Sequence, residues 1–243
     1  MDWVVKFLTS TIGRKLVLAL SGLLLCGFLI VHLGGNLLMF VGPEAYNTYA
    51  HTLHSQEWLV KTAEVGLLLL FAAHIVIAIN TDRENRESRG RDYQLKDSKQ
   101  STFLPWQLLA ENWMIISGLI VLAFLIIHLA DFTFEATPNL MEKIKGHEPF
   151  DKAMIILRNP FSAIIYVVGC LLLGWHLSHG FRSAFQSLGI NHPKYTKAIE
   201  NLGKVFALVI ALGFACFPIW AAVSNYKVPD LSTDPPAAVS AQK

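Results

Sequence analysis

The sequence predicts an all-α membrane protein with five transmembrane helices, of which four form a bundle and the fifth lies beside it. Of the 243 residues, 53 % are hydrophobic and only 16 % are charged, whereas soluble domains carry about a quarter charged residues. The mean hydropathy is +0.43. Five apolar runs are each long enough to cross a hydrocarbon layer about 30 Å thick, which takes roughly 17–25 helical residues.

The predicted spans are residues 16–41, 63–79, 113–130, 161–179 and 205–223. The first is too long for the apolar part of a signal peptide, and no small-residue cleavage site follows it, so we expect it to remain as a span. Residues 1–227 are therefore predicted to form a single integral membrane domain. The tail 228–243 is rich in Pro, Ala and Ser and is predicted to be disordered.

The distribution of Lys and Arg predicts the orientation of the spans, because positive residues favour the cytoplasmic side. Thirteen of these residues lie on one side of the predicted membrane and seven on the other side. The thirteen are Lys6, Arg14, Lys15, Arg83, Arg86, Arg89, Arg91, Lys96, Lys99, Arg182, Lys194, Lys197 and Lys204. We therefore expect the N-terminus in the cytoplasm and the C-terminus outside.

Charge and cysteine content exclude several classes of protein. The net charge of +2 and the absence of a basic tract argue against nucleic acid as a partner. Three cysteines without a CxxC pattern exclude a disulfide framework and a thiolate zinc site, and the missing CxxCH excludes covalently attached haem.

An internal repeat links the first and third spans. Residues 21–33 and 117–129 are identical at eight of thirteen positions, including Ser-Gly at the start and a histidine near the end. The second and fourth spans share a looser pattern, with a glycine seven or eight residues before a histidine. The chain is thus predicted to contain two helix pairs in parallel repeat, followed by a fifth helix.

Each repeated span carries one deep histidine, and ionisable residues within the bilayer are functional candidates by default. From the helical rise, His32 and His128 lie roughly 24 and 22 Å above the cytoplasmic ends of their spans. His74 and His176 lie about 16 and 22 Å below the outer ends of theirs. This predicts an outer pair, His32 with His128, and an inner pair, His74 with His176, separated by roughly 10–15 Å in depth.

Two facing imidazoles at one level in a helical bundle are typical of bis-His ligation of haem iron. Zinc would need three or four ligands at one level, and no carboxylate or cysteine joins either pair. We therefore predict two haems b per chain, the four-helix bundle being the haem-binding part. Further candidate contacts to the cofactor are Ser21, Ser117, His179 and Arg182. The alternative is that the histidines only pack against neighbouring helices.

Three motifs carry a resemblance to a known family: Ser-Gly-x9-His in the first span, the tract Ala45-Tyr46-Asn47-x-Tyr49-Ala50, and His176-x3-Gly180. They resemble the cytochrome b membrane anchor of succinate dehydrogenase and fumarate reductase, in its single-chain, five-helix, dihaem form. The resemblance runs from the first span to the fifth. The four histidines match the axial ligands of that family, in the pairing obtained from depth.

The resemblance implies the partners and the activity. A cytoplasmic flavoprotein would oxidise succinate or reduce fumarate, and an iron–sulfur subunit would dock on the cytoplasmic face of this chain. Electrons would pass through both haems to a membrane quinone, which in this type is usually menaquinone, as part of the respiratory chain and the tricarboxylic acid cycle. The chain would be an electron-transfer and quinone-reacting subunit of the enzyme, in the cytoplasmic (inner) membrane of a bacterium, without a succinate or flavin site of its own.

One position departs from the family. Some members carry a glutamate two residues before the fourth axial histidine, implicated in proton transfer, and this chain has Gly174 there. We therefore expect no proton path through that position.

A quinone site is predicted on a short segment outside the membrane. Residues 44–58 place Asn47, His51, His54 and Trp58 on one helical face, together with Glu44. Such a face could hydrogen-bond a quinone carbonyl, or it could be an ordinary solvated face of an interfacial helix.

Two other functions are compatible with parts of the pattern. A dihaem cytochrome b of a hydrogenase or a formate dehydrogenase also passes electrons to quinone, but it would leave the tract at Tyr46 and Asn47 unexplained. A transporter or other haem-free membrane protein could use the histidines as proton relays, although a relay does not require two depth-matched pairs.

Overall fold

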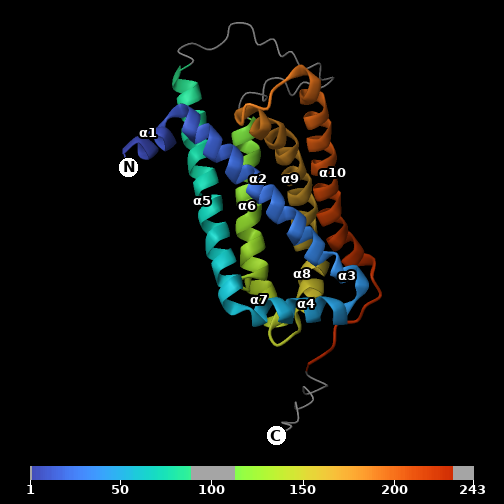
Figure 1. The fold of residues 1–243 in the computed structure, drawn as a ribbon. Helices are drawn as coiled ribbons and strands as arrows, with labels where there is room; N and C mark the ends of the chain where they lie inside the picture. Colours follow the sequence, from blue (N-terminus) through green and yellow to red (C-terminus); the bar gives the residue numbers. More distant parts are fainter. Residues whose placement is uncertain (1, 89–112, 232–243) are drawn as a thin grey trace.

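A computed structural model describes residues 2–88 and 113–231, and Figure 1 shows the course of the chain. Its helices are α1 Asp2–Thr9, α2 Thr11–Asn36, α3 Leu38–Val41, α4 Pro43–Ser55, α5 Glu57–Ser88, α6 Trp113–Phe132, α7 Pro138–Ile144, α8 Pro149–Arg158, α9 Pro160–Ser187 and α10 Pro193–Val223. No strand occurs in these ranges, which confirms the all-α class. Four of the basic residues used for the orientation, Arg89, Arg91, Lys96 and Lys99, lie outside the described residues, as does the tail from residue 232.

Five helices within the described ranges are long and apolar enough to cross a membrane, as predicted. They cover Thr11–Val41, Glu57–Glu87, Met114–Phe132, Pro160–Ser187 and Pro193–Val223. Most are longer than the apolar runs that predicted them, because polar turns at their ends continue the helix. On α5, for example, Arg83 and Arg86 pair with carboxylates four residues away, which stabilises the turns beyond the apolar run.

Proline and an upstream acceptor mark where several helices begin. Proline is the first residue of α4, α7, α8, α9 and α10, a position where its missing N–H has no intrahelical partner to lose. Asn159 precedes α9, and its side chain accepts hydrogen bonds from the N–H groups of Phe161 and Ser162. Gly42 connects α3 to α4 with φ of 135°, a conformation that favours glycine.

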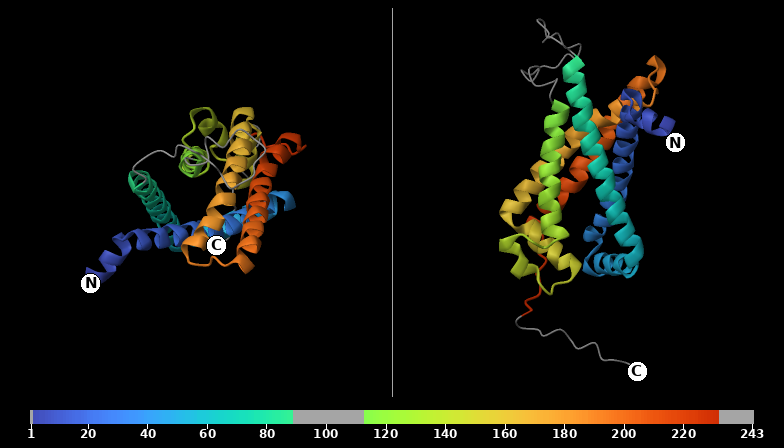
Figure 2. Two further views of the ribbon diagram at one scale, coloured as in Figure 1. Left: turned by 90° about the horizontal axis from the view of Figure 1, so that it is seen from above. Right: turned by 90° about the vertical axis from the view of Figure 1, so that its left-hand side faces the viewer.

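The long helices form a bundle in which α2 packs against α5 and α9, and α6 packs against α9. α10 lies along the outer side of α9, as Figures 1 and 2 show. Small residues allow this close approach: a Cβ atom on Gly174 would lie 2.5 Å from the Cβ of Ala211. Four helices thus enclose the bundle axis and the fifth covers one side of it, as the sequence predicts.

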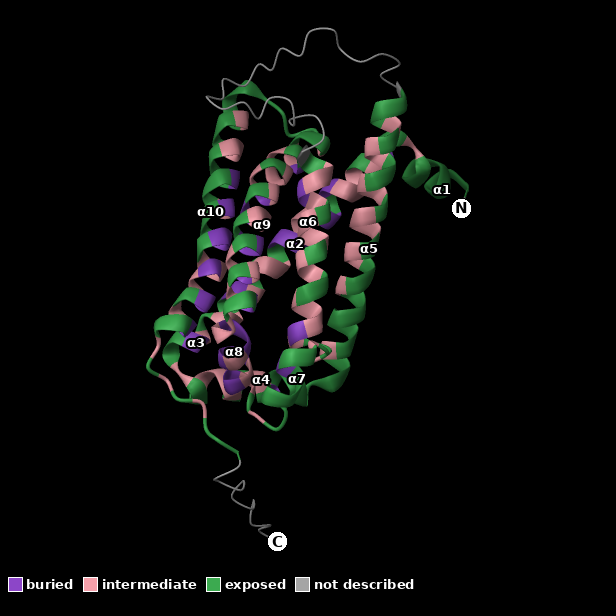
Figure 3. Cartoon of the chain, turned by 180° about the vertical axis from the view of Figure 1, so that it is seen from behind, coloured by how far each residue is buried: buried purple, intermediate pink, exposed green. Residues whose placement is uncertain are grey.

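Many of the most buried side chains lie at the end of the bundle opposite α1, where α3, α4, α7 and α8 form what we call the short-helix layer. Met39, Ile144, Phe150, Met154 and Ile156 are each at most 1 % exposed. By contrast, none of the described α5 side chains is buried (Figure 3). The apolar surface of α5 therefore suits contact with lipid rather than with protein.

The chain following α10 crosses the short-helix layer and is tied to α8. Arg158 donates hydrogen bonds to the carbonyl oxygens of Ala221 and Ser224, at 2.9 and 2.8 Å. The hydroxyl of Tyr226 donates to Asp151 at 2.6 Å. The C-terminal end of α10 is thereby fixed at the end of the bundle opposite α1 (Figure 1).

Candidate functional site

The predicted inner histidine of the first repeat is held by the serine of the Ser-Gly motif. The hydroxyl of Ser21 on α2 donates to the carbonyl oxygen of Leu18 at 3.0 Å and lies 2.9 Å from Nδ1 of His74 on α5. A serine hydroxyl has one hydrogen, so with that hydrogen on Leu18 it accepts the second bond from an Nδ1–H group. This assigns the proton to Nδ1 and leaves Nε2 of His74 with a free lone pair.

The second repeat makes the same contact. On α6 the hydroxyl of Ser117 donates to the carbonyl oxygen of Met114 at 3.0 Å and lies 3.0 Å from Nδ1 of His176 on α9. Both serines are buried, with 3 % and 2 % of their surface exposed. The repeat seen in the sequence is therefore a repeat of one interaction: a serine of one helix orients the histidine of the next.

The glycine of each motif makes room for the same histidine. A Cβ atom on Gly22 would lie 3.3 Å from Cε1 of His74, and one on Gly118 would lie 3.5 Å from Cε1 of His176. An added methyl group would press on the imidazole at Gly22 and would be in ordinary van der Waals contact with it at Gly118. In each motif the serine thus hydrogen-bonds the histidine, and the glycine, which has no side chain, leaves space for the imidazole ring.

The predicted outer pair is brought into direct contact. The rings of His32 on α2 and His128 on α6 have centroids 5.8 Å apart and meet nearly edge to face, at 80°. Phe28 stacks on His32, and Phe132 and Tyr166 lie against His128, at centroid distances of 5.3 to 6.0 Å. The two imidazoles therefore face each other in an aromatic surrounding.

Helical register places the two pairs at different levels. The bound serine and the outer histidine are eleven residues apart on α2 and on α6 alike, which is about 16 Å along each helix. Because the serines bind His74 and His176, these two histidines lie at the level of the serines, toward the α1 end. The separation is close to the 10–15 Å expected from the sequence.

The available metal-ligating side chains indicate which cofactor the histidine pairs could bind. Within the described residues no three of His, Cys, Asp or Glu gather as metal ligands. The outer pair brings two imidazole rings together, and two imidazole ligands suit a metal whose other ligands come from a macrocycle, as in haem.

Comparison with known families, with curated proteins and with solved structures found no match. The interpretation of the site therefore depends on its residues.

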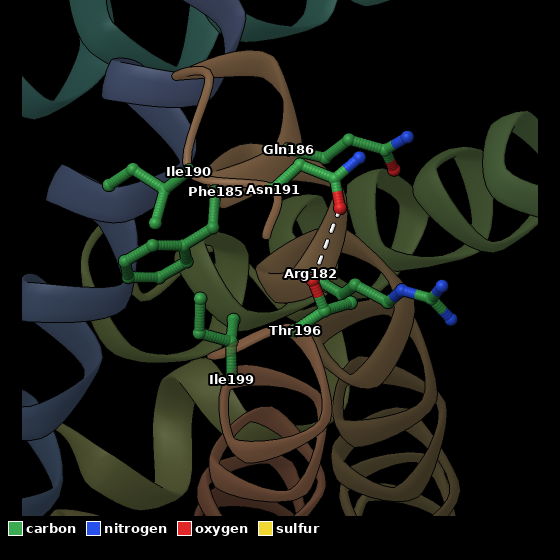
Figure 4. Close-up of a pocket in the computed structure, with 7 residues that line it drawn as sticks. All are labelled: Arg182, Phe185, Gln186, Ile190, Asn191, Thr196 and Ile199. Carbon is green, nitrogen blue, oxygen red and sulfur yellow. Dashed lines mark hydrogen bonds between the residues drawn. The ribbon is translucent and has the colours of Figure 1, made fainter. Parts of the chain in front are cut away.

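His179 and Arg182 are bonded to residues other than the inner pair, although His179 lies only about one helical turn from His176 on α9. His179 is exposed, stacks on Trp175 of its own helix at 5.9 Å and has its Nδ1 within 3.1 Å of that residue's carbonyl oxygen. Arg182 lies 3.4 Å from Glu200 of α10. It also lines a small hollow of about 10 Å³ at the α9–α10 turn, where Thr196 donates to Asn191 (Figure 4). That volume holds one water molecule at most.

The segment predicted to bind quinone is divided by the structure. α4 ends at Ser55 and α5 begins at Glu57, so Trp58 belongs to a different helix from the rest of the face. The prediction of one continuous helical face over 44–58 is wrong in this respect. Gln56 breaks the helix with φ of −94° and ψ of 56°, which are not helical values.

Two of the predicted quinone residues contact α8. The side-chain oxygen of Asn47 accepts from the backbone N–H of Phe150 at 2.9 Å, and Nε2 of His51 lies 2.7 Å from a carboxylate oxygen of Glu148. His54 is exposed, with Nδ1 within 2.8 Å of the Ala50 carbonyl oxygen of its own helix. An open hollow of about 500 Å³ at the start of α4 is lined by residues 41–45 and Thr48, and not by Asn47, His51 or His54.

Gly174, where some members of the resembling family carry glutamate, faces α10. A Cβ atom there would lie 2.5 Å from Ala211 Cβ and 3.0 Å from the carbonyl oxygen of Ala207. A carboxylate side chain has no room at this position unless α9 and α10 move apart.

Sequence reasoning missed a polar cluster beside the outer pair. Asp131, at the end of α6, is 2 % exposed and accepts hydrogen bonds from the hydroxyls of Thr137 and Tyr166. The signal was a carboxylate directly after the apolar run and three residues after His128.

Proposed function

We propose that this chain is the dihaem cytochrome b membrane anchor of a succinate:quinone oxidoreductase. The observation that carries the proposal is the pair of Ser–His hydrogen bonds, which orient His74 and His176 with Nε2 free. Metal-bound histidines characteristically donate their other ring N–H to an acceptor, which fixes the tautomer and the ring. A histidine that only packed within the bundle would not need the same arrangement in both repeats.

Four histidines would hold two haems, His74 with His176 for the inner one and His32 with His128 for the outer one. Haem b, when bound, accepts and releases one electron at a time. Ser21 and Ser117 would then keep the inner imidazoles in position. The phenylalanines around His32 and His128 would exclude water from the outer site, and a dry surrounding influences a haem's potential.

The partners and the orientation follow from the resemblance and from the charge distribution. An iron–sulfur subunit, itself bound to a flavoprotein, would dock at the α1 end, which carries the basic residues predicted to be cytoplasmic. Electrons would pass from that end through the inner and then the outer site to a quinone, which the resemblance implies to be menaquinone, or in the reverse direction. We place the chain in the cytoplasmic membrane of a bacterium, with the short-helix layer on the outer side.

A pyridine haemochrome assay on the purified complex tests the haem content, and we expect two haems b per chain. The variants His176→Ala and His179→Ala form a matched pair on one helix. We expect the first to lose one haem and the second to keep both. A wild-type complex without visible-light absorption would contradict the proposal and favour a transporter or proton relay.

The partner enzyme is tested on the same preparation. Bound flavin and succinate-dependent reduction of the haems are the expected results. Two haems without a flavoprotein would contradict the assignment to succinate:quinone oxidoreductase and favour the cytochrome b of a hydrogenase or formate dehydrogenase.

The quinone residues are tested separately. We expect His51→Ala or His54→Ala to lower quinone turnover while both haems are retained. Wild-type turnover in both variants would contradict a role for this face.

A further inference from the structure

A buried carboxylate lies at the end of α6, and both of its oxygens are hydrogen-bonded. Both oxygens of Asp131 accept: one from the hydroxyl of Thr137 and the other from the hydroxyl of Tyr166 at 2.9 Å. An ionised carboxylate only accepts hydrogen bonds, so two hydroxyl donors match it. Burying a charge is costly unless hydrogen bonds compensate it, and here both oxygens are compensated.

The loop following α6 is shaped to provide one of these donors. Glu135 has φ of 48°, a conformation uncommon for residues other than glycine, and its side chain is bonded to Lys152 of α8 at 2.5 Å. The turn brings the chain back so that Thr137 reaches Asp131. Lys152 is thus paired with Glu135, and the hydrogen bonds described for Asp131 come from neutral hydroxyls.

Asp131 lies close to the outer pair. It follows His128 by three residues, about 4.5 Å along the helix, and Tyr166, which it binds, has its ring 6.0 Å from the ring of His128. Tyr166 is itself 5 % exposed and also contacts Phe124 and Phe132. A chain of direct contacts thus joins the carboxylate to the outer imidazoles through apolar surroundings.

The charge has no equivalent in the first repeat. The residue three positions after His32 is Gly35, and a Cβ atom there would meet the ring of Tyr49. At the inner level, the side chains bound to the histidines are serine hydroxyls, which are neutral. Asp131 therefore distinguishes the outer site from the inner one.

We propose that Asp131 is a fixed negative charge that lowers the reduction potential of the outer site relative to the inner one. This inference rests on the proposed function. Reduction adds one electron at the outer site, and a nearby negative charge opposes that gain. At about 10 Å and an effective dielectric constant of about 20, one charge changes such an equilibrium roughly tenfold.

The test is a potentiometric titration of the purified complex, with the haems followed by their visible absorption at constant pH. In Asp131→Asn we expect the ratio of reduced to oxidised outer haem, at a given potential, to rise about tenfold. The inner haem should be unchanged. The variant His128→Ala, which should lack the outer haem, identifies which titration step belongs to it.

Asp151 offers a matched control. It is also a buried carboxylate that accepts from a tyrosine hydroxyl, but its tyrosine, Tyr226, packs on Phe150 rather than on a histidine. We expect Asp151→Asn to leave both titration steps in place. An equal shift in the two variants would overturn the proposal, because it would reflect a general loosening of the fold.

Retention of both haems in Asp131→Asn with unchanged potentials would overturn the inference and leave the proposed function intact. If Asp131→Asn does not hold the outer haem, Asp131→Ser, whose hydroxyl is neutral and can still bind Tyr166, is titrated instead with the same criterion. Loss of the outer haem in both variants would assign Asp131 a structural role and overturn the proposal. Absence of haem from the wild-type complex would instead refute the proposed function itself.

Discussion

The serines of the two Ser-Gly motifs allow a sharp test of the inner site. In Ser21→Ala the imidazole of His74 loses the acceptor that lies 2.9 Å from its Nδ1. The change is small in volume, so the helix packing should survive. The variant therefore isolates the hydrogen bond from the fold.

The size of the effect follows from the partial burial of the pair, in which Ser21 is buried and His74 is half-buried. A buried donor left without an acceptor costs about 1–3 kcal/mol, and removing a hydrogen-bond partner of a metal ligand typically lowers affinity 10–100-fold. The two ranges agree, since tenfold in affinity is about 1.4 kcal/mol. We expect haem affinity of the inner site to fall at least tenfold in Ser21→Ala, and by a similar factor in Ser117→Ala, whose bond measures 3.0 Å.

The assay is a titration of haem-depleted complex with haem, followed by absorption. Ser178→Ala is the matched control: this serine also donates to a carbonyl oxygen three residues earlier on α9, but the histidine it meets is His179. We expect the control to bind as the wild type does. If Ser21→Ala and Ser178→Ala bind haem equally well, the tautomer assignment and the role of the repeat are refuted.

Three further predictions concern packing, helix termini and ionisation. Gly22→Ala should weaken the inner site more than Gly118→Ala, because the added methyl would lie 3.3 rather than 3.5 Å from the imidazole; equal haem titrations would contradict this. Asn47→Ala should lower the free energy of unfolding by about 1 kcal/mol, since α8 loses an acceptor at its N-terminus, and an unchanged melting temperature would refute it. Burial and the bond to Asp151 raise the pKa of Tyr226 to about 12 from an ordinary 10.0, so its contribution to stability persists below pH 10.0 and is lost as the pH rises through about 12. An ultraviolet titration should lack this late step in Tyr226→Phe, and a wild-type curve without it would disprove the assignment.

The spans and the proximity of His32 to His128 could be predicted, because both follow from patterns along the sequence. Apolar runs identify transmembrane helices, and the helical rise alone assigns His32 and His128 to one level. The repeat also pointed to Ser21 and Ser117. The sequence did not predict that these serines bind His74 and His176. A hydrogen bond between two helices depends on the rotation of each helix about its axis, and the spacing of residues along the sequence does not determine that rotation.

The short-helix layer could not be predicted for a related reason. Asn47 and His51 have the spacing of a ligand-binding face, yet their partners lie 103 and 97 residues later. A polar residue on an interfacial helix has the same sequence pattern whether it meets a quinone, water or another helix. Asp131 was overlooked because a carboxylate at the end of a span usually belongs to the solvated turn that follows.

The distribution of the histidines over the repeats has a consequence for biogenesis. Each serine binds a histidine of its own helix pair, so either pair can orient its inner histidine as soon as its two helices meet. Each histidine pair, however, takes one member from each repeat. A chain that enters the membrane from its N-terminus has both outer histidines once α6 is inserted, whereas the inner site waits for α9. The two outer histidines are thus the first pair to be complete during synthesis, although Tyr166, which lies against His128, arrives only with α9.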